Sequence, residues 1–96
     1  MLNELTHSDF EDLEDKSFEI DFGEAGRLTA TLEKTARFDL EPEEGKREPF
    51  SIFLRCPAPP VQRTYPATNS KLGTLELFLV PIDENEDGIL FEAVFT

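Results

Sequence analysis

Apolar and polar residues alternate with a period of two along much of this chain, and that alternation restricts the fold to one built from half-buried β-strands. Residues 18–22 read Phe-Glu-Ile-Asp-Phe, and residues 27–38 continue the same period. The segment Gly-Glu-Ala-Gly at 23–26 lies between them and is typical of a hairpin turn. Lys34 breaks the apolar set of the second segment, which predicts a β-bulge or a strand end at this position.

Two C-terminal segments, residues 74–82 and 89–95, are apolar on both of their faces. Strands of this kind lie centrally in a sheet, beneath a helix or against another subunit. The acidic segment 83–88 predicts a hairpin turn with Gly88 at a positive-φ position. One face carries Leu75, Leu77, Leu79, Ile89, Phe91, Ala93 and Phe95, and the other carries Phe78, Val80, Ile82, Leu90 and Val94.

The middle of the chain predicts one further strand and two irregular segments. Residues 49–56 form the strand, with Phe53 on the face that points away from its main apolar set. Segment 39–48 is charged and contains proline and glycine, so we expect a loop. Segment 57–70 holds four prolines, which lack the N–H that a central strand needs. We therefore expect an irregular excursion there, with a short edge strand near residues 61–65.

The N-terminal segment 1–14 predicts a short helix that must dock on the rest of the molecule, because so short a helix is unstable alone in water. Ser8 and Glu11 have the spacing of a capping box. The apolar side of this helix would carry Leu2, Leu5, Phe10 and Leu13.

Together these patterns predict a mainly β protein with one short N-terminal helix. We expect one domain, residues 1–96, in which the docking helix precedes a β-domain at 17–96. Five strands are clearly indicated and a sixth is uncertain, so the architecture is a small antiparallel β-barrel or a two-sheet sandwich.

The charge balance limits the possible partners. The chain has 9 basic and 21 acidic residues, for a formal net charge of −12. Such a charge repels phosphate backbones and anionic membranes, so we expect neither nucleic acid nor membrane binding, and a bias toward basic partners. The single cysteine allows no intrachain disulfide, and the start lacks a signal-peptide pattern, which favours the cytoplasm.

The acidic turn resembles half of a calcium-binding loop. Asp83, Asn85 and Asp87 are followed by a glycine, as in the first half of an EF-hand loop. The twelfth position is Val94 where such a loop needs a bidentate glutamate. We therefore treat the three residues as weak metal candidates and expect no metal and no cofactor.

The sequence contains few side chains in a pattern typical of catalysis, so we expect that the protein is not an enzyme. The only histidine, His7, lies in the predicted helix, while Cys56 occupies an inward strand position without an evident base. Glu76 and Glu92 lie on neighbouring strands, where Arg55 could pair with one of them.

Several stretches of the chain resemble a family of small bacterial proteins classified only as a domain of unknown function. They are LTHSDFEDLEDKSFEI at 5–20, PFSIFLR at 49–55, QRTYP at 62–66, LGTLELFLVPI at 72–82 and GILFEAVF at 88–95. Genes of this family often lie beside those of phage-tail-collar-like, microcystin-dependent-protein-like fibre proteins. The resemblance implies an accessory or structural role in such a system, and it implies no activity and no site residues.

Our leading hypothesis is a non-enzymatic interaction protein that packs against a protein partner or against itself. The physical reason is the surplus of apolar surface on the C-terminal hairpin. One alternative is a β-barrel that holds a small apolar ligand, and another is an acidic decoy of a nucleic-acid-binding protein. The candidate interaction residues are Phe53, Phe78, Val80, Leu90 and Val94.

Overall fold

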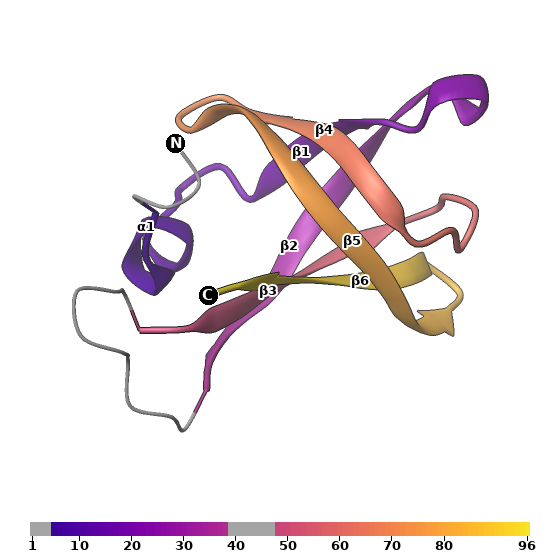
Figure 1. The fold of residues 1–96 in the computed structure, drawn as a ribbon. Coiled ribbons are helices and arrows are strands. Elements are labelled where there is room, and N and C mark those ends of the chain that lie inside the picture. Colours follow the sequence, from indigo (N-terminus) through magenta and orange to yellow (C-terminus); the bar gives the residue numbers. More distant parts are fainter. Residues whose placement is uncertain (1–4, 39–47) are drawn as a thin grey trace.

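Six antiparallel strands close into a barrel in the computed structural model, which describes residues 5–38 and 48–96 (Figure 1). The strand order around the barrel is β1-β2-β3-β6-β5-β4. This confirms the mainly β class with one short helix, and it selects the barrel over the sandwich. The strands are β1 (Ser17–Asp21), β2 (Arg27–Arg37), β3 (Phe50–Cys56), β4 (Arg63–Asn69), β5 (Gly73–Asn85) and β6 (Gly88–Phe95), and the helical elements are α1 (His7–Glu11) and η2 (Gly23–Ala25).

The alternation of apolar residues fixes which side of each strand faces the interior. Strand β3 shows this clearly, because Phe50, Ile52, Leu54 and Cys56 are all fully buried. Strands β2 and β3 shift register between Leu32 and Lys34. The interruption predicted at Lys34 is therefore a β-bulge. The loop predicted at 39–48 lies outside the described residues except for its last position.

The proline-rich segment is irregular as predicted over residues 57–62, but the prediction was wrong for the residues that follow. Strand β4 begins at Arg63 and continues to Asn69, so it is longer than the expected edge strand and is a full member of the barrel. It pairs along its whole length with β5, from Arg63 opposite Leu79 to Asn69 opposite Gly73. Its one proline, Pro66, is tolerated because the pairing with β1 on its other side starts at the next residue.

The seam between β1 and β4 closes the barrel and is short. Among the described residues the two strands pair where Glu19 meets Thr68 and where Ile20 meets Ala67. The buried side chain of Asn69 ties this seam to the N-terminal segment, because its amide donates to the carbonyl oxygens of Asp15 at 3.0 Å and Ser17 at 3.1 Å.

Helix α1 is shorter than predicted, and its N-cap lies earlier than expected. The N-cap is Thr6, whose backbone N–H donates to Asp9 Oδ2 at 2.8 Å in a capping box. Ser8, the predicted cap, lies inside the helix. Both pairs have the same spacing, and the structure uses the earlier one. Residues 1–4, with Leu2, lie outside the described residues.

Helix α1 lies at one end of the barrel (Figure 1), and it docks there through a buried aromatic ring. Phe10 is fully buried, and its ring centroid lies 6.3 Å from that of Phe18, 5.8 Å from Phe50 and 5.2 Å from Phe95. The predicted docking of the segment is thus confirmed, with Phe10 and Leu13 in the core and Leu5 packed against it. No helix in the described part of the chain is long and apolar enough to cross a bilayer.

Candidate interaction surface

The five candidate interaction residues all lie on one side of the barrel, on strands β3, β6 and β5. Phe53 pairs with Glu92, and Glu92 pairs with Val80 on its other side. Leu90 and Val94 are two positions away from Glu92 on β6, so they point to the same side. The intervening residues of each strand point into the core. Phe78 and Val94 line a common surface hollow of about 230 Å³.

We call this surface the outer apolar face, and it comprises Phe53, Phe78, Val80, Ile82, Leu90 and Val94. Four large apolar side chains are exposed in the described residues, and three of them belong to this face. They are Phe78 and Val94, each 52% exposed, and Ile82, which is 47% exposed. Phe53, Val80 and Leu90 are half-buried. The face therefore presents three exposed apolar side chains to water, with three half-buried ones on the same side of the barrel.

Ile82 belongs to this face although it was not among the candidate residues. The pairing of β5 with β6 shifts between Pro81 and Asp83, so Ile82 is the extra residue of a β-bulge. Its place in the alternation of β5 already put it on the same side as Phe78 and Val80. The bulge itself has no sequence signal beyond the proline that precedes it.

Glu92 lies in the middle of the outer apolar face. Phe53 and Val80 lie beside it across the sheet, and Leu90 and Val94 lie on either side along β6. The Ser51 hydroxyl, itself buried, donates to Glu92 Oε2 at 2.8 Å.

Comparison with known protein families finds a match that spans nearly the whole chain. The family model described as Domain of unknown function (DUF6916) matches residues 5–95. The chain belongs to this family. No curated protein and no solved structure matches it. The DUF6916 match thus covers the helix and all six strands.

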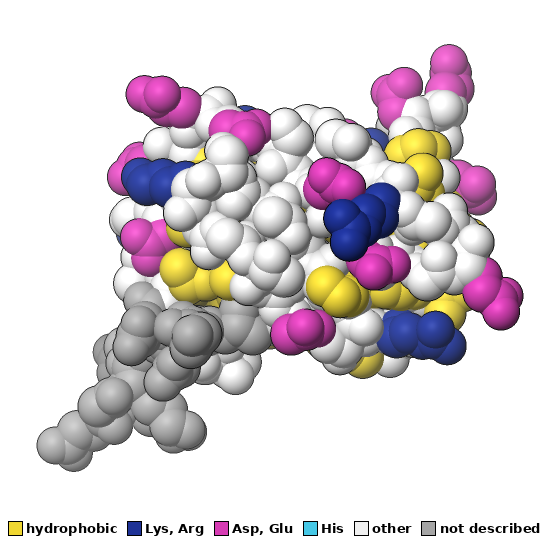
Figure 2. Space-filling model, turned by 90° about the horizontal axis from the view of Figure 1, so that it is seen from above, with side chains coloured by type: hydrophobic (Ala, Val, Ile, Leu, Met, Phe, Trp, Pro, Cys, Tyr) yellow, Lys and Arg dark blue, Asp and Glu magenta, His cyan; other side chains and the backbone are white. Residues whose placement is uncertain are grey.

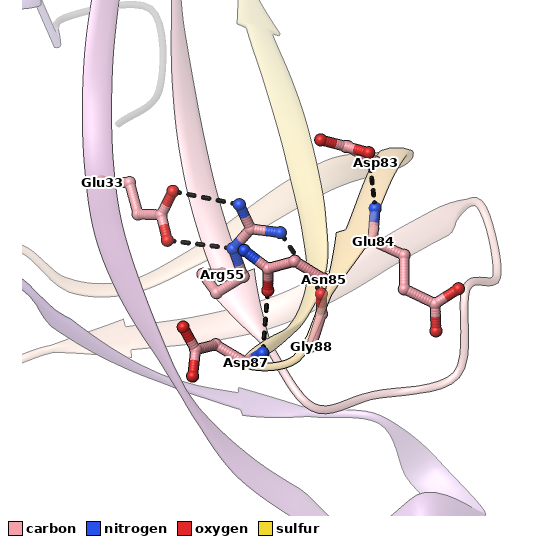
Figure 3. Close-up of polar contacts among 7 residues, drawn as sticks. All are labelled: Glu33, Arg55, Asp83, Glu84, Asn85, Asp87 and Gly88. Atoms are coloured by element: carbon pink, nitrogen blue, oxygen red, sulfur yellow. Dashed lines mark hydrogen bonds and ion pairs between the residues drawn. The ribbon is translucent and has the colours of Figure 1, made fainter.

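Arg55 was predicted to pair with Glu76 or Glu92, and that prediction is wrong. In this DUF6916 domain Arg55 forms a bidentate salt bridge with Glu33 on β2 instead. Its Nε donates to Oε2 at 2.9 Å and its Nη2 donates to Oε1 at 3.3 Å (Figure 3). Its third nitrogen donates to the carbonyl oxygen of Gly88 at 3.3 Å. The hydrogen bond to Glu33 raises the pKa of the Arg55 guanidinium. The bulge in β2 places Glu33 beside Arg55, and the sequence alone does not show this.

The weak metal candidates do not converge on one point. Asp83 Oδ1 accepts a hydrogen bond from the N–H of Glu84 at 2.9 Å, and Asn85 Oδ1 accepts one from the N–H of Asp87 at 2.8 Å. Figure 3 shows the carboxylates of Asp83 and Asp87 on opposite sides of the hairpin. Within the described ranges, no group of three or more histidine, cysteine or acidic side chains is placed to hold a metal ion. These oxygens shape the turn.

His7, a possible general base, and Cys56, a possible nucleophile, lie far apart. His7 Nε2 lies 3.0 Å from Thr35 Oγ1, and its ring packs edge-on against Phe50. Phe50 begins strand β3, and Cys56 is buried at the other end of that strand, six residues or about 20 Å away. Burial raises the pKa of the Cys56 thiol to about 11.

The opposite end of the barrel from α1 has a second hollow. It measures about 550 Å³ and is lined in part by Phe22, Val61, Arg63 and Tyr65. The Tyr65 hydroxyl donates to the carbonyl oxygen of Val61 at 2.8 Å, and its ring lies 4.7 Å from that of Phe22. The tyrosine therefore closes the barrel end and holds the proline-rich connection in place.

The side of the barrel that carries β1 and β4 contrasts with the outer apolar face. Figure 2 shows this side, where apolar side chains are separated by polar and charged ones. Its hollow of about 250 Å³ is lined by Glu19, Asp21, Arg27, Pro66, Thr68 and Thr74. Arg27 and Glu19 approach to 3.8 Å there, and both are well exposed.

Proposed function

We propose that this DUF6916 domain is a non-catalytic interaction module that binds a protein partner through the outer apolar face. The observation that carries the proposal is the exposure of Phe78, Ile82 and Val94 together on one side of a closed barrel. Contiguous exposed apolar surface on a small domain is typical of a protein-binding site. Burying a fully exposed large apolar side chain contributes roughly 1.5–3 kcal/mol, and Phe78, Ile82 and Val94, which are already about half-buried, would contribute about half of this each when covered.

The closed barrel also limits how the partner binds. The strand order closes on itself, so every strand of the described barrel has a neighbour on both sides. A partner strand therefore has no long free edge to extend, which is the usual route of β-strand addition. Binding through side chains of a sheet face is the mode that remains.

The sequence resembles a family that is often encoded beside phage-tail-collar-like fibre proteins. We therefore propose that the partner is a structural protein of such an assembly. We also propose the cytoplasm as the compartment where the domain folds, because its one cysteine is free and buried.

The alternative of a ligand-binding barrel draws no support from the described interior. Fully buried side chains fill it, among them Phe18, Phe91, Ile52, Leu54 and Leu79. The alternative of an acidic decoy rests on net charge alone.

The proposal is tested by placing a charge at Phe78. Tagged wild-type protein, Phe78→Glu and Thr29→Glu are used as baits in extracts of the source cell, and the retained proteins are identified and re-tested in purified form. Thr29→Glu is the matched control, because Thr29 is also exposed on a strand but lies away from the outer apolar face. We expect a partner that the wild type and Thr29→Glu retain and Phe78→Glu loses, with all three proteins folded. A partner held equally by all three baits contradicts the proposal.

A further inference from the structure

The carboxylate of Glu92 is the one charged group surrounded by the outer apolar face. Phe53 and Val80 flank it across the sheet, and Leu90 and Val94 flank it along β6. Any partner that covers the apolar side chains also removes water from this carboxylate. Burying an unpaired charge is strongly unfavourable, so the chemistry of Glu92 limits what can bind.

The chain itself does not supply a cation to Glu92 within residues 5–38 and 48–96. Its hydrogen-bond donor is the neutral hydroxyl of Ser51. Arg55, the basic residue nearest along the face of β3, is held by both oxygens of Glu33. The Nζ of Lys34 lies over the ring of Phe53 at 5.2 Å from its centroid.

A second copy of the chain is a poor occupant of this face. Each copy carries a net charge of −12, so two copies repel each other as they approach. A two-fold dimer uses the same patch on both subunits, and this would bury two Glu92 carboxylates in one small interface. The partner must instead bring positive charge to the centre of an apolar surface.

We propose that the outer apolar face binds another protein through an arginine that pairs with Glu92 and is flanked by apolar residues. The inference rests on the proposed function and names the chemistry of its partner. Arginine fits better than lysine, because its guanidinium is planar, weakly hydrated and able to bond both carboxylate oxygens. It also stacks favourably on an exposed aromatic ring such as that of Phe78.

A peptide selection tests this chemistry without knowledge of the natural partner. A random peptide library displayed on phage is selected against the full-length wild-type protein, and enriched peptides are synthesised. Their dissociation constants are measured by calorimetry for wild type, Glu92→Gln, Glu24→Gln and Phe78→Ser. Glu24→Gln is the matched control, because it removes the same charge from an exposed position in η2.

We expect enriched peptides to combine arginine with apolar residues and to lose at least about tenfold in affinity with Glu92→Gln. Glu24→Gln should leave the affinity within about twofold, since screened surface charges contribute little. Replacing the peptide arginine by neutral citrulline should cause the same loss as Glu92→Gln. Combining the two changes should add little, as expected for two members of one pair.

Other results overturn the inference in distinguishable ways. Peptides without a cation, or with unchanged affinity for Glu92→Gln, refute the arginine pairing, and the proposed function survives if Phe78→Ser abolishes their binding. Peptides unaffected by Phe78→Ser refute both. Failure to enrich any peptide also refutes the arginine pairing. A wild-type dimer in sedimentation that Phe78→Ser dissociates would show that a second copy occupies the face.

Discussion

Substituting alanine for Gly88 should destabilise the domain far more than the same change at Gly23, Gly26 or Gly73. Gly88 opens β6 with a φ of +120°, a region that L-residues rarely adopt. A Cβ built there would lie 2.5 Å from the carbonyl oxygen of Cys56, 2.7 Å from its carbonyl carbon and 2.8 Å from Cα of Pro57. All three atoms belong to the backbone, so no side-chain rotation relieves the overlap.

The magnitude follows from two costs. Backbone strain at such a φ is about 1–3 kcal/mol, and forcing an extra methyl into a packed site costs about 1–3 kcal/mol more. We therefore expect Gly88→Ala to lower the free energy of unfolding by roughly 2–6 kcal/mol. For a domain of this size each kcal/mol lowers Tm by about 4–8 °C. A decrease at the upper end of the range equals the whole stability of a domain at the low end of the usual range of about 5–15 kcal/mol.

Gly73→Ala is the matched control. Gly73 also has a positive φ, +76°, but no atom lies within 4 Å of its added Cβ. Its cost is limited to about 1–2 kcal/mol of left-handed strain, offset by about 0.4–1 kcal/mol from reduced freedom of the unfolded chain. Urea denaturation followed by circular dichroism measures both variants, with unchanged m-values as a check of two-state unfolding. Equal stabilities of the two variants would refute the close approach of Gly88 to the Cys56–Pro57 backbone.

Three further outcomes can be checked in the same protein. Thr6→Ala should cost about 0.5–2 kcal/mol through loss of the helix cap, while Ser8→Ala should cost less than about 0.5 kcal/mol, and equal effects in urea denaturation would contradict the observed N-cap. Hydrogen bonds from the Ser17 hydroxyl, the Ser17 N–H and Ser70 lower the pKa of Asp15 below its ordinary value of 3.8, so its stabilising contribution is complete above that value and is lost as pH falls through the folded-state pKa. An NMR titration should find Asp15 ionising below 3.8, and Asp15→Asn should flatten the stability profile in this acid range. Burial raises the pKa of Cys56 to about 11. The contribution of the buried thiol to the free energy of unfolding is therefore complete below the ordinary thiol pKa of 9.0 and is lost as pH rises through 11. A thiol reagent at pH 8 should label native protein no faster than the protein unfolds, and immediate labelling would show that the thiol is accessible.

The alternation of apolar residues predicted most of the fold, because side-chain direction in a strand has a strict period of two. Strands β1, β2 and β3 follow that pattern closely, and Lys34 marked the bulge in β2. Strands β5 and β6 were instead indicated by apolar residues on both of their faces. Strand β4 was expected only as a short edge strand near residues 61–65, because prolines weigh against strands, whereas only Pro66 falls inside it. Whether a proline is tolerated depends on which neighbouring strand needs its N–H, and this is a property of the closed barrel.

The candidate surface was predicted through the same alternation, and its polar partners were not. Phe78 and Val94 lie on the outer side of adjacent strands because the residues before and after each of them point into the core. The pairing of Arg55 with Glu33 depends on a bulge that changes the register of two strands. The position of Glu92 in the middle of the face depends on how β6 is placed between β3 and β5. Both require knowledge of the strand order.

The short seam between β1 and β4 sets the route by which the barrel opens. With pairing at Glu19–Thr68 and Ile20–Ala67, this junction has fewer interstrand hydrogen bonds to break than the others. We expect its amide hydrogens to exchange with solvent at the lowest free energy of any strand junction. Opening there exposes two free strand edges that the closed barrel lacks. At high concentration such edges pair between molecules, so exchange of the β1 strand between two chains is the form of misassembly that this topology favours.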